Sequence, residues 1–232
     1  MSLLEVSKLE GFYGDFQALF GIDISVDVGQ VVAVIGANGA GKSTLLAAIT
    51  GLLPKKRGSI LFDGIEILNE RADRIAKRGI ALVPEGRRLF PSLTVEENLK
   101  MGLVAGRTGH WSLPRIYELF PMLQTLRTQP ATRLSGGQQQ MVSIGRALLT
   151  NPKLLLCDEI SLGLAPKVIS EIYACFAEIK AIGVAIVLVE QDVVRANETA
   201  DSLYCVLEGR VSLSGVAGTF GIEEISRAYF GS

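Results

Sequence analysis

The sequence predicts an α/β fold with a mostly parallel sheet, because short apolar runs alternate with segments of helical periodicity. Three runs are continuously apolar, which is typical of strands covered on both faces: residues 80–83, 154–157 and 184–189. Helical patterns lie beside these strands, at residues 42–51, 71–78, 135–150 and 166–182. With 232 residues, the chain is long enough to bury a sizeable core.

The first strand signal near the N-terminus has a period of two. Ile22, Ile24, Val26 and Val28 alternate with polar or small residues, and Gly29 then offers a turn. We expect a hairpin that leads into a buried strand at residues 31–35.

The stretch from about residue 85 to 132 has a different character. Thr94 is a candidate helix N-cap with Glu97 three residues later, and a second helix is expected over residues 113–126. Prolines at positions 114, 121 and 130 interrupt the region. We interpret it as a small helical lobe inserted between two strands of the main domain.

The C-terminal part predicts two further elements. Residues 206–214 are expected to form a hairpin that turns at residues 208–210, and a short helix should follow near residues 223–229.

Composition excludes several classes of partner and site. The formal net charge is −1, so nothing predicts a nucleic-acid partner. The longest apolar run, residues 181–189, is far shorter than the roughly 18 to 20 residues that span a bilayer. We therefore expect a cytosolic chain that reaches a membrane only through a partner. Cys157, Cys175 and Cys205 lack CxxC spacing and are expected to be buried free thiols.

The first chemical motif is Gly36-Ala-Asn-Gly-Ala-Gly-Lys-Ser43, which follows an apolar strand and opens a helix. This is the Walker A pattern, in which glycines let backbone N–H groups point at phosphate oxygens. Lys42 is expected to reach the β- and γ-phosphates and Ser43 to coordinate Mg²⁺. A glycine-rich turn without function is the simpler alternative, which the strand and helix on either side disfavour.

The second motif is Lys153-Leu-Leu-Leu-Cys-Asp158-Glu159, an apolar strand that ends in two carboxylates. Such a strand end beside a phosphate loop is where Mg²⁺ needs a ligand, so Asp158 is assigned to the metal. Glu159 is then placed to orient and deprotonate the attacking water. Two carboxylates that are merely solvated remain the alternative.

A third motif narrows the enzyme class, since kinases and helicases share the first two. Leu134-Ser-Gly-Gly-Gln138 lies about 20 residues before Asp158 and resembles the signature of ABC ATPases. Ser135 offers a hydroxyl, and Gly136 and Gly137 allow close backbone contact at a helix N-terminus. The resemblance extends from about residue 3 to residue 215.

The resemblance implies a P-loop NTPase core with a mostly parallel sheet, an antiparallel β subdomain and a helical lobe inserted at about residues 86–150, all in one domain over residues 1–232. It implies ATP and Mg²⁺ as ligands, bound in a head-to-tail dimer of two ATPase subunits. The nucleotide contacts that it implies are Tyr13, Gly36, Ala37, Asn38, Gly39, Ala40, Gly41, Lys42, Ser43, Thr44 and Glu85.

The same resemblance implies three further groups of site residues. Catalysis is assigned to Glu159, Gln191 and Lys42, and Mg²⁺ to Ser43, Asp158 and Glu85. The signature residues that would contact the ATP of the partner subunit are Ser135, Gly136, Gly137 and Gln138.

Departures from the general pattern point to one subgroup. Glu85 stands where the family usually has glutamine, Gln191 where it has the switch histidine, and Ile160 where it has proline. Together with residues 162–166, these resemble the smaller ATPase of high-affinity branched-chain amino-acid importers. That implies permease subunits in the membrane, a second ATPase subunit in a hetero- or homodimer, indirect contact with a solute-binding protein, and a place at the cytoplasmic membrane face.

Three rival functions stay open at this stage. A urea or amide importer would use a closely related ATPase. A soluble non-transport ABC ATPase is expected to carry a coiled-coil insertion, tandem cassettes or a basic stripe, which this sequence lacks. A non-hydrolysing ATP-dependent interaction module would not need intact Lys42, Asp158 and Glu159. Arg87 and Arg88 are candidate permease contacts or, equally, solvated charges.

Overall fold

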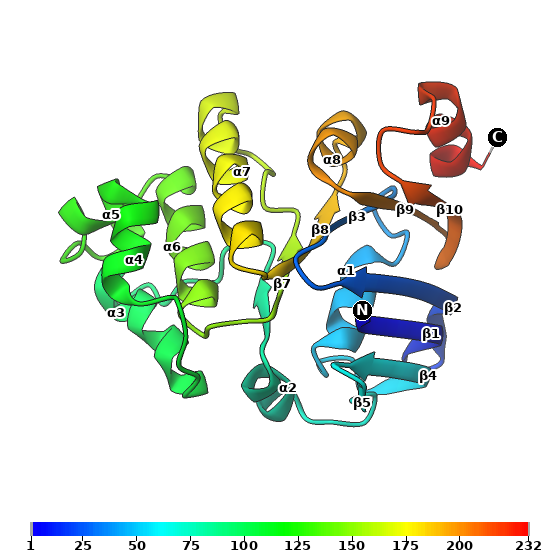
Figure 1. Cartoon of the computed structure of the whole chain (residues 1–232), viewed down its shortest axis with the longest axis horizontal. Helices are drawn as coiled ribbons and strands as arrows, with labels where there is room; N and C mark the ends of the chain where they lie inside the picture. Colours follow the sequence, from blue (N-terminus) through cyan, green and yellow to red (C-terminus); the bar gives the residue numbers. More distant parts are fainter. Residues whose placement is uncertain (1, 232) are drawn as a thin grey trace.

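The computed structural model describes residues 2–231 and contains two sheets (Figure 1). The larger sheet has the order β10-β9-β3-β8-β7-β6, with bounds β3 (Val31–Ile35), β6 (Ile80–Val83), β7 (Leu154–Asp158), β8 (Ala185–Glu190), β9 (Ser202–Leu207) and β10 (Arg210–Val216). Its strands are parallel except β10, which pairs antiparallel with β9. The predicted mostly parallel sheet is thereby confirmed.

The smaller sheet is antiparallel and has the order β2-β1-β4-β5. Its strands are β1 (Ser2–Tyr13), β2 (Phe16–Asp27), β4 (Lys55–Phe62) and β5 (Ile65–Glu66). The expected hairpin between residues 22–28 and the strand at 31–35 is wrong, because β2 pairs with β1 and β3 lies in the other sheet. The physical reason is burial: β2 buries alternate residues, whereas all five residues of β3 are buried and need a central position.

Hydrophobic side chains form two main cores, one on each face of the larger sheet. Along β7, Leu154 and Leu156 pack with α1 (Lys42–Ile49) and the smaller sheet. The alternate residues Leu155 and Cys157 pack against α6 (Gly136–Leu148) and α7 (Pro166–Ala181). Alternate residues of β7 thus face opposite sides of the sheet, and α1 lies between the two sheets, where it continues the loop that follows β3 (Figure 1).

The helical lobe lies between β6 and β7 in the chain and at one end of the molecule (Figure 1). Its elements are α3 (Val95–Lys100), η1 (Met101–Ala105), α4 (Leu113–Leu119), α5 (Pro121–Thr125), η2 (Ala131–Arg133) and α6. Thr94 caps α3 in a capping box with Glu97, as predicted.

The single helix expected over residues 113–126 is wrong, because the chain leaves the helical conformation at Phe120, with φ −128° and ψ 76°. Proline disfavours the helical conformation in the residue before it and has no N–H to donate. Pro121 therefore ends one helix and begins the next.

The last quarter of the chain closes one edge of the larger sheet. The β9–β10 hairpin turns at Glu208 and Gly209, as predicted, and α9 (Ile222–Phe230) follows it. The helix α8 (Val193–Thr199) has no counterpart among the predictions. The three cysteines are buried and free, as expected.

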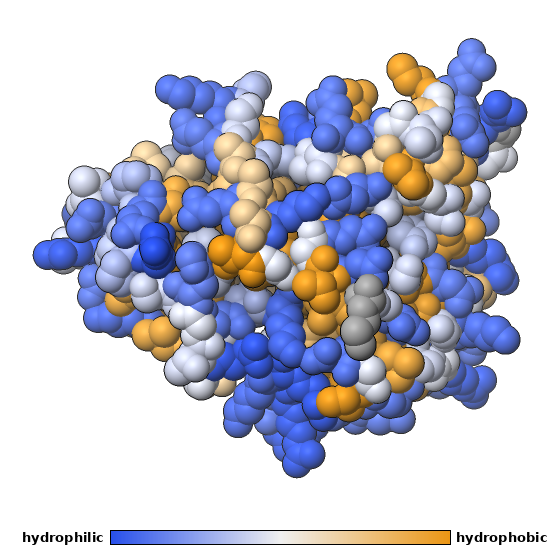
Figure 2. All heavy atoms as spheres, viewed as in Figure 1, coloured by the Kyte–Doolittle hydropathy of each residue, from blue (hydrophilic) through white to orange (hydrophobic). Residues whose placement is uncertain are grey.

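The surface is mainly hydrophilic on the face seen in Figure 2, most densely around α2 (Ala72–Arg78) at the lower edge. Hydrophobic atoms are exposed at the tips of α8 and α9. No helix within residues 2–231 has the length and apolar character that crossing a membrane requires.

Candidate functional site

The phosphate-binding loop, residues 36–43, is held against the β9–β10 hairpin. A Cβ on Gly36 would lie 2.2 Å from the Val206 carbonyl oxygen, so only glycine fits there. Gly209 N–H donates to the Ala40 carbonyl at 2.8 Å. The loop then ends at Gly41, which has φ 110° and is the N-cap of α1.

The side chain of Lys42 turns back over this loop. It is 4% exposed, and its Nζ donates to the carbonyls of Gly36 at 2.8 Å and Ala37 at 3.1 Å. The same ammonium lies 3.4 Å from Glu159 Oε1. Lys42 thus holds a positive charge at the mouth of the loop, where phosphate oxygens would bind.

Two side-chain oxygens that could bind a metal ion meet beside the loop. Ser43 Oγ donates to Asp158 Oδ1 at 3.1 Å, and Asp158 is the last residue of β7. Burial raises the pKa of Asp158, the Ser43 hydrogen bond opposes that rise, and the charges of Glu159 and Glu85 add to it. Within the described residues, no group of three or more His, Cys, Asp or Glu side chains is arranged to hold a metal ion. Mg²⁺ commonly uses one or two protein oxygens with phosphates and waters, so the pair of Ser43 and Asp158 fits this ion.

Glu159 follows Asp158 and is held from three sides. Its backbone has φ 45°, a left-handed conformation that is uncommon outside glycine, and its N–H donates to the Val189 carbonyl at 3.0 Å. Its carboxylate accepts from Gln191 Nε2 at 2.5 Å and faces Lys42. Residues 32 positions apart meet because β8, which ends at residue 190, is the strand beside β7.

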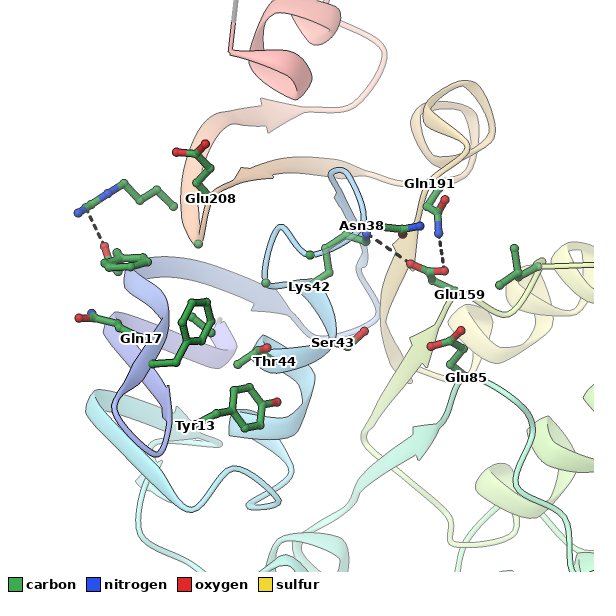
Figure 3. Close-up of a pocket in the computed structure, with 18 residues that line it drawn as sticks. Tyr13, Gln17, Asn38, Lys42, Ser43, Thr44, Glu85, Glu159, Gln191 and Glu208 are labelled. Atoms are coloured by element: carbon green, nitrogen blue, oxygen red, sulfur yellow. Dashed lines mark hydrogen bonds and ion pairs between the residues drawn. The ribbon is translucent and has the colours of Figure 1, made fainter.

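A cleft of about 910 Å³ opens over these side chains (Figure 3). Of the predicted site residues, it is lined by Tyr13, Asn38, Gly39, Gly41, Lys42, Ser43, Thr44, Glu85, Glu159 and Gln191. Gly36, Ala37, Ala40 and Asp158 do not line it, although Gly36 and Ala37 accept from Lys42 and Asp158 accepts from Ser43. Tyr13 is 51% exposed and lies on the other side of the cleft from Glu159 and Glu85 (Figure 3).

Sequence reasoning missed eight lining residues: Phe16, Gln17, Ala18, Phe20, Leu162, Glu208, Gly209 and Arg210. The aromatic residues Tyr13, Phe16 and Phe20 around Gly14 are a signal that would have suggested a hairpin with stacking faces. Glu208, Gly209 and Arg210 gave no sign in the sequence of a place in the site, because the β9–β10 turn meets the phosphate loop only in the folded chain.

The signature residues lie outside this cleft. Ser135 caps α6: Gln138 N–H donates to its Oγ at 3.4 Å, and Ser135 N–H donates to Gln138 Oε1 at 2.9 Å. A Cβ on Gly137 would lie 2.5 Å from Val168 Cγ1 on α7, which explains the glycine. Ser135 is exposed, and none of the four signature residues lines the cleft.

Comparison with known proteins identifies what this arrangement resembles. The family model described as ABC transporter matches residues 19–161, more than half of the chain. The chain is 44% identical over 211 residues to the high-affinity branched-chain amino acid transport ATP-binding protein BraG of Pseudomonas aeruginosa, covering 90% of this chain and 91% of BraG. It is 34% identical over 218 residues to a probable branched-chain amino acid transport ATP-binding protein, LivF, of Archaeoglobus fulgidus, covering 93% and 92%.

Solved structures agree with this fold. An ATP-binding subunit of an ABC transporter superposes with a TM-score of 0.85 at 31% identity, covering 97% of this chain and 98% of that chain. A dimeric ATP-binding cassette in a post-hydrolysis state, bound to ADP and Pi, superposes with a TM-score of 0.81 at 27% identity, covering 94% and 100%.

Proposed function

The chain belongs to the ABC transporter family and is an ATPase, and we propose that it energises an importer of branched-chain amino acids. The observation that carries ATP hydrolysis, the source of energy in this proposal, is the Glu159 carboxylate, held between Lys42 and Gln191 at the mouth of the phosphate loop. Similarity to BraG over 90% of the chain supports the choice of solute. No contact in this chain favours another transported solute, because the solute itself would not touch an ATPase subunit.

The residues around the loop would hold ATP and Mg²⁺ in distinct places. Backbone N–H groups of residues 36–44 and Lys42 would bind the phosphates, and Tyr13 would stack on the adenine. Ser43 and Asp158 would hold Mg²⁺, with Glu85 in the lining of the same cleft. When bound, this ion would neutralise charge on the phosphate oxygens.

Hydrolysis would use Glu159 as the general base that accepts the proton of the attacking water. Gln191 would keep its carboxylate in place through the 2.5 Å hydrogen bond. An amide donates without carrying a charge, so Gln191 would orient the base without the positive charge that a histidine can supply.

A second ATPase subunit would complete the site. At the start of the 13-residue helix α6, Ser135 is exposed, Gly136 and Gln138 are half-buried and Gly137 is buried, yet all four lie outside the cleft of their own chain. A helix N-terminus favours an anion, so they would contact ATP held by the partner. The dimeric cassette that superposes on this chain supports the arrangement. We propose that the physiological partner is a different ATPase, with a homodimer as the alternative outcome of the test below.

Permease subunits would dock on the side of the helical lobe that faces α2. A groove of about 250 Å³ lies between α2 and the lobe, and Leu52, Ile75, Met101 and Arg146 are among the residues that line it. Leu52 and Met101 are exposed at this groove, at 61% and 41%, and offer apolar contacts to a partner. Docking there would hold the chain at the cytoplasmic membrane face and connect it only indirectly to a solute-binding protein.

The replacement Glu159→Gln tests the chemistry. It should leave ATP binding within about twofold of the parent, while phosphate release falls by at least about 100-fold, because the base is lost. Glu66→Gln is the control, since that carboxylate anchors β4 to β5 away from the cleft. Normal phosphate release by the Glu159 variant would remove Glu159 from this role.

The same variant tests assembly and transport. With ATP and Mg²⁺ it should accumulate as a dimer in light scattering, either alone or with the second ATPase subunit, because the bridging nucleotide is not hydrolysed. In vesicles that contain the complete transporter, it should abolish ATP-driven leucine uptake. Uptake that continues unchanged in the variant would refute the role of Glu159, and absence of leucine uptake with the parent chain would refute the proposed importer function.

A further inference from the structure

Three consecutive residues at the end of β8 contact the segment that follows β7. The Val189 carbonyl accepts from Glu159 N–H at 3.0 Å, Glu190 Oε2 accepts from Ser161 Oγ at 2.8 Å, and Gln191 Nε2 donates to Glu159 Oε2 at 2.5 Å. The middle contact is the one to which no role in the site has been assigned.

Glu190 is an unusual residue for its position. It is 2% exposed and ends a strand whose five preceding residues are all apolar. Its second oxygen accepts from the Tyr173 hydroxyl of α7 at 2.6 Å. Burial raises the pKa of Glu190, and the hydrogen bonds from Tyr173 and Ser161 oppose that rise. A buried carboxylate is costly, and apolar residues generally stabilise such a position as well or better, so stability alone does not account for Glu190.

The contacts of Glu190 reach two other parts of the molecule. Ser161 begins the segment that contains Leu162, which is 54% exposed and lines the ATP cleft. The guanidinium of Arg195, on α8, lies 5.6 Å from the centre of the Tyr173 ring. Glu190 thus joins α7 to the segment after Glu159 through one carboxylate, and α8 is connected to it only through the contact of Arg195 with Tyr173.

We propose that Glu190 is a positioning residue for ATP hydrolysis: by binding Ser161 and Tyr173, it holds the segment after β7 and the residue Gln191 in the register that places Glu159. The left-handed backbone of Glu159 gives a reason for such a clamp, since an uncommon conformation persists only where its surroundings enforce it. Glu190 itself does not line the ATP cleft, so its effect passes through Gln191 and Glu159. This inference rests on the roles proposed for those two residues.

The test compares two replacements of Glu190 in the full chain with its partner subunits. Glu190→Ala removes the clamp and should lower kcat at least about tenfold, because small misplacements of a catalytic group are costly, while KM for ATP stays within about twofold. Glu190→Gln should keep kcat within about threefold of the parent, since an amide can accept from one hydroxyl and donate to the other. Tyr173→Phe and Ser161→Ala each remove one contact and should lower kcat by less than Glu190→Ala does.

Glu66→Ala is the matched control. Glu66 also accepts from a serine hydroxyl and from backbone N–H groups, but it lies in the smaller sheet. It should lower the free energy of unfolding and leave kcat per folded molecule unchanged. Where Glu190→Ala does not fold, the double variant Ser161→Ala with Tyr173→Phe provides the same comparison.

A double-mutant cycle shows whether Glu190 acts through Gln191. Glu190→Ala should lower kcat clearly less in a Gln191→Ala background than in the parent. An equal loss in both backgrounds, an unchanged kcat, or a loss that merely follows the folded fraction or ATP affinity would overturn the inference. Normal hydrolysis by Glu159→Gln would show that the proposed role of Glu159 is itself wrong. If Glu159→Gln is inactive while Glu190→Ala hydrolyses ATP normally, only the role of Glu190 is refuted.

Discussion

At the scale of single residues, the site depends on how one carboxylate is held. Glu159 lies between the ammonium of Lys42, the first residue of α1, and the amide of Gln191, which directly follows β8. The ammonium lies 3.4 Å from one carboxylate oxygen, and the neutral amide donates a hydrogen bond to the other. Gln191 therefore takes a positioning task that requires a donor but no titratable charge.

The replacement Gln191→Ala follows from this geometry. We expect kcat for ATP hydrolysis to fall about tenfold, because Glu159 loses the 2.5 Å hydrogen bond that orients it, while ATP affinity is little changed. Steady-state phosphate release and nucleotide titration check the two quantities. Gln30→Ala is a suitable control, because the Gln30 amide donates to Ser202 at a distance from the cleft. An unchanged rate would show that the position does not contribute to hydrolysis.

At the scale of elements, the chain contains two capping boxes with different tasks. Thr94 and Glu97 begin α3, and Ser135 and Gln138 begin α6, in each case through reciprocal side chain to backbone hydrogen bonds. The local physics is the same, since both satisfy N–H groups that a helix leaves without partners. Only the second lies in the signature motif.

These two caps provide a matched pair of substitutions. Thr94→Ala and Ser135→Ala should each lower the free energy of unfolding by about 1 kcal/mol, which denaturant titration can measure. Ser135→Ala alone should also lower ATP hydrolysis in the assembled dimer, because its hydroxyl would be missing from the partner's site. Equal hydrolysis by both variants would contradict the proposed role of the signature, whatever their stabilities.

At the scale of the whole molecule, ion pairs between elements make stability depend on pH. Asp201 joins β3 to α7: its carboxylate accepts from Val31 N–H at 2.8 Å and from Lys180 Nζ at 2.6 Å. Burial raises the pKa of Asp201, but the hydrogen bonds from Lys180 and Val31 outweigh it and hold the pKa below its ordinary value. A carboxyl with a lowered pKa binds fewer protons folded than unfolded, so its stabilisation is present above its ordinary pKa, near 4, and is lost as the pH falls below it.

We expect the free energy of unfolding to decrease as the pH is lowered through about 4, and Asp201→Asn to make that decrease shallower. Denaturant titrations at pH 7, 4 and 3 measure the slope. Asp63→Asn, which removes the charge of an exposed partner of Lys153, is the comparison for a general charge effect. Identical slopes for the parent and Asp201→Asn would show that the ion pair does not contribute.

The local features of the fold were predictable from sequence, because neighbouring residues decide them. The apolar β3 followed by residues 36–43 indicated a phosphate loop, and Thr94 with Glu97 indicated a helix start. The prediction of one helix over residues 113–126 was wrong, although Pro121 carried the necessary signal. The hairpin between β2 and β3 was wrong for another reason: alternation shows which face of a strand is buried, but it does not show which sheet buries it.

The sequence by itself determined the chemistry of this protein: a phosphate loop, two carboxylates at a strand end and a capped glycine-rich helix start, each set by a few adjacent residues. Only the tertiary structure decided which of them meet. It brought Gln191 to Glu159 by placing β8 beside β7, set Gly209 against the phosphate loop, and left the signature outside the cleft of its own chain. The physical reason is that a motif is satisfied by local backbone geometry, whereas strand order depends on how distant apolar faces are buried together.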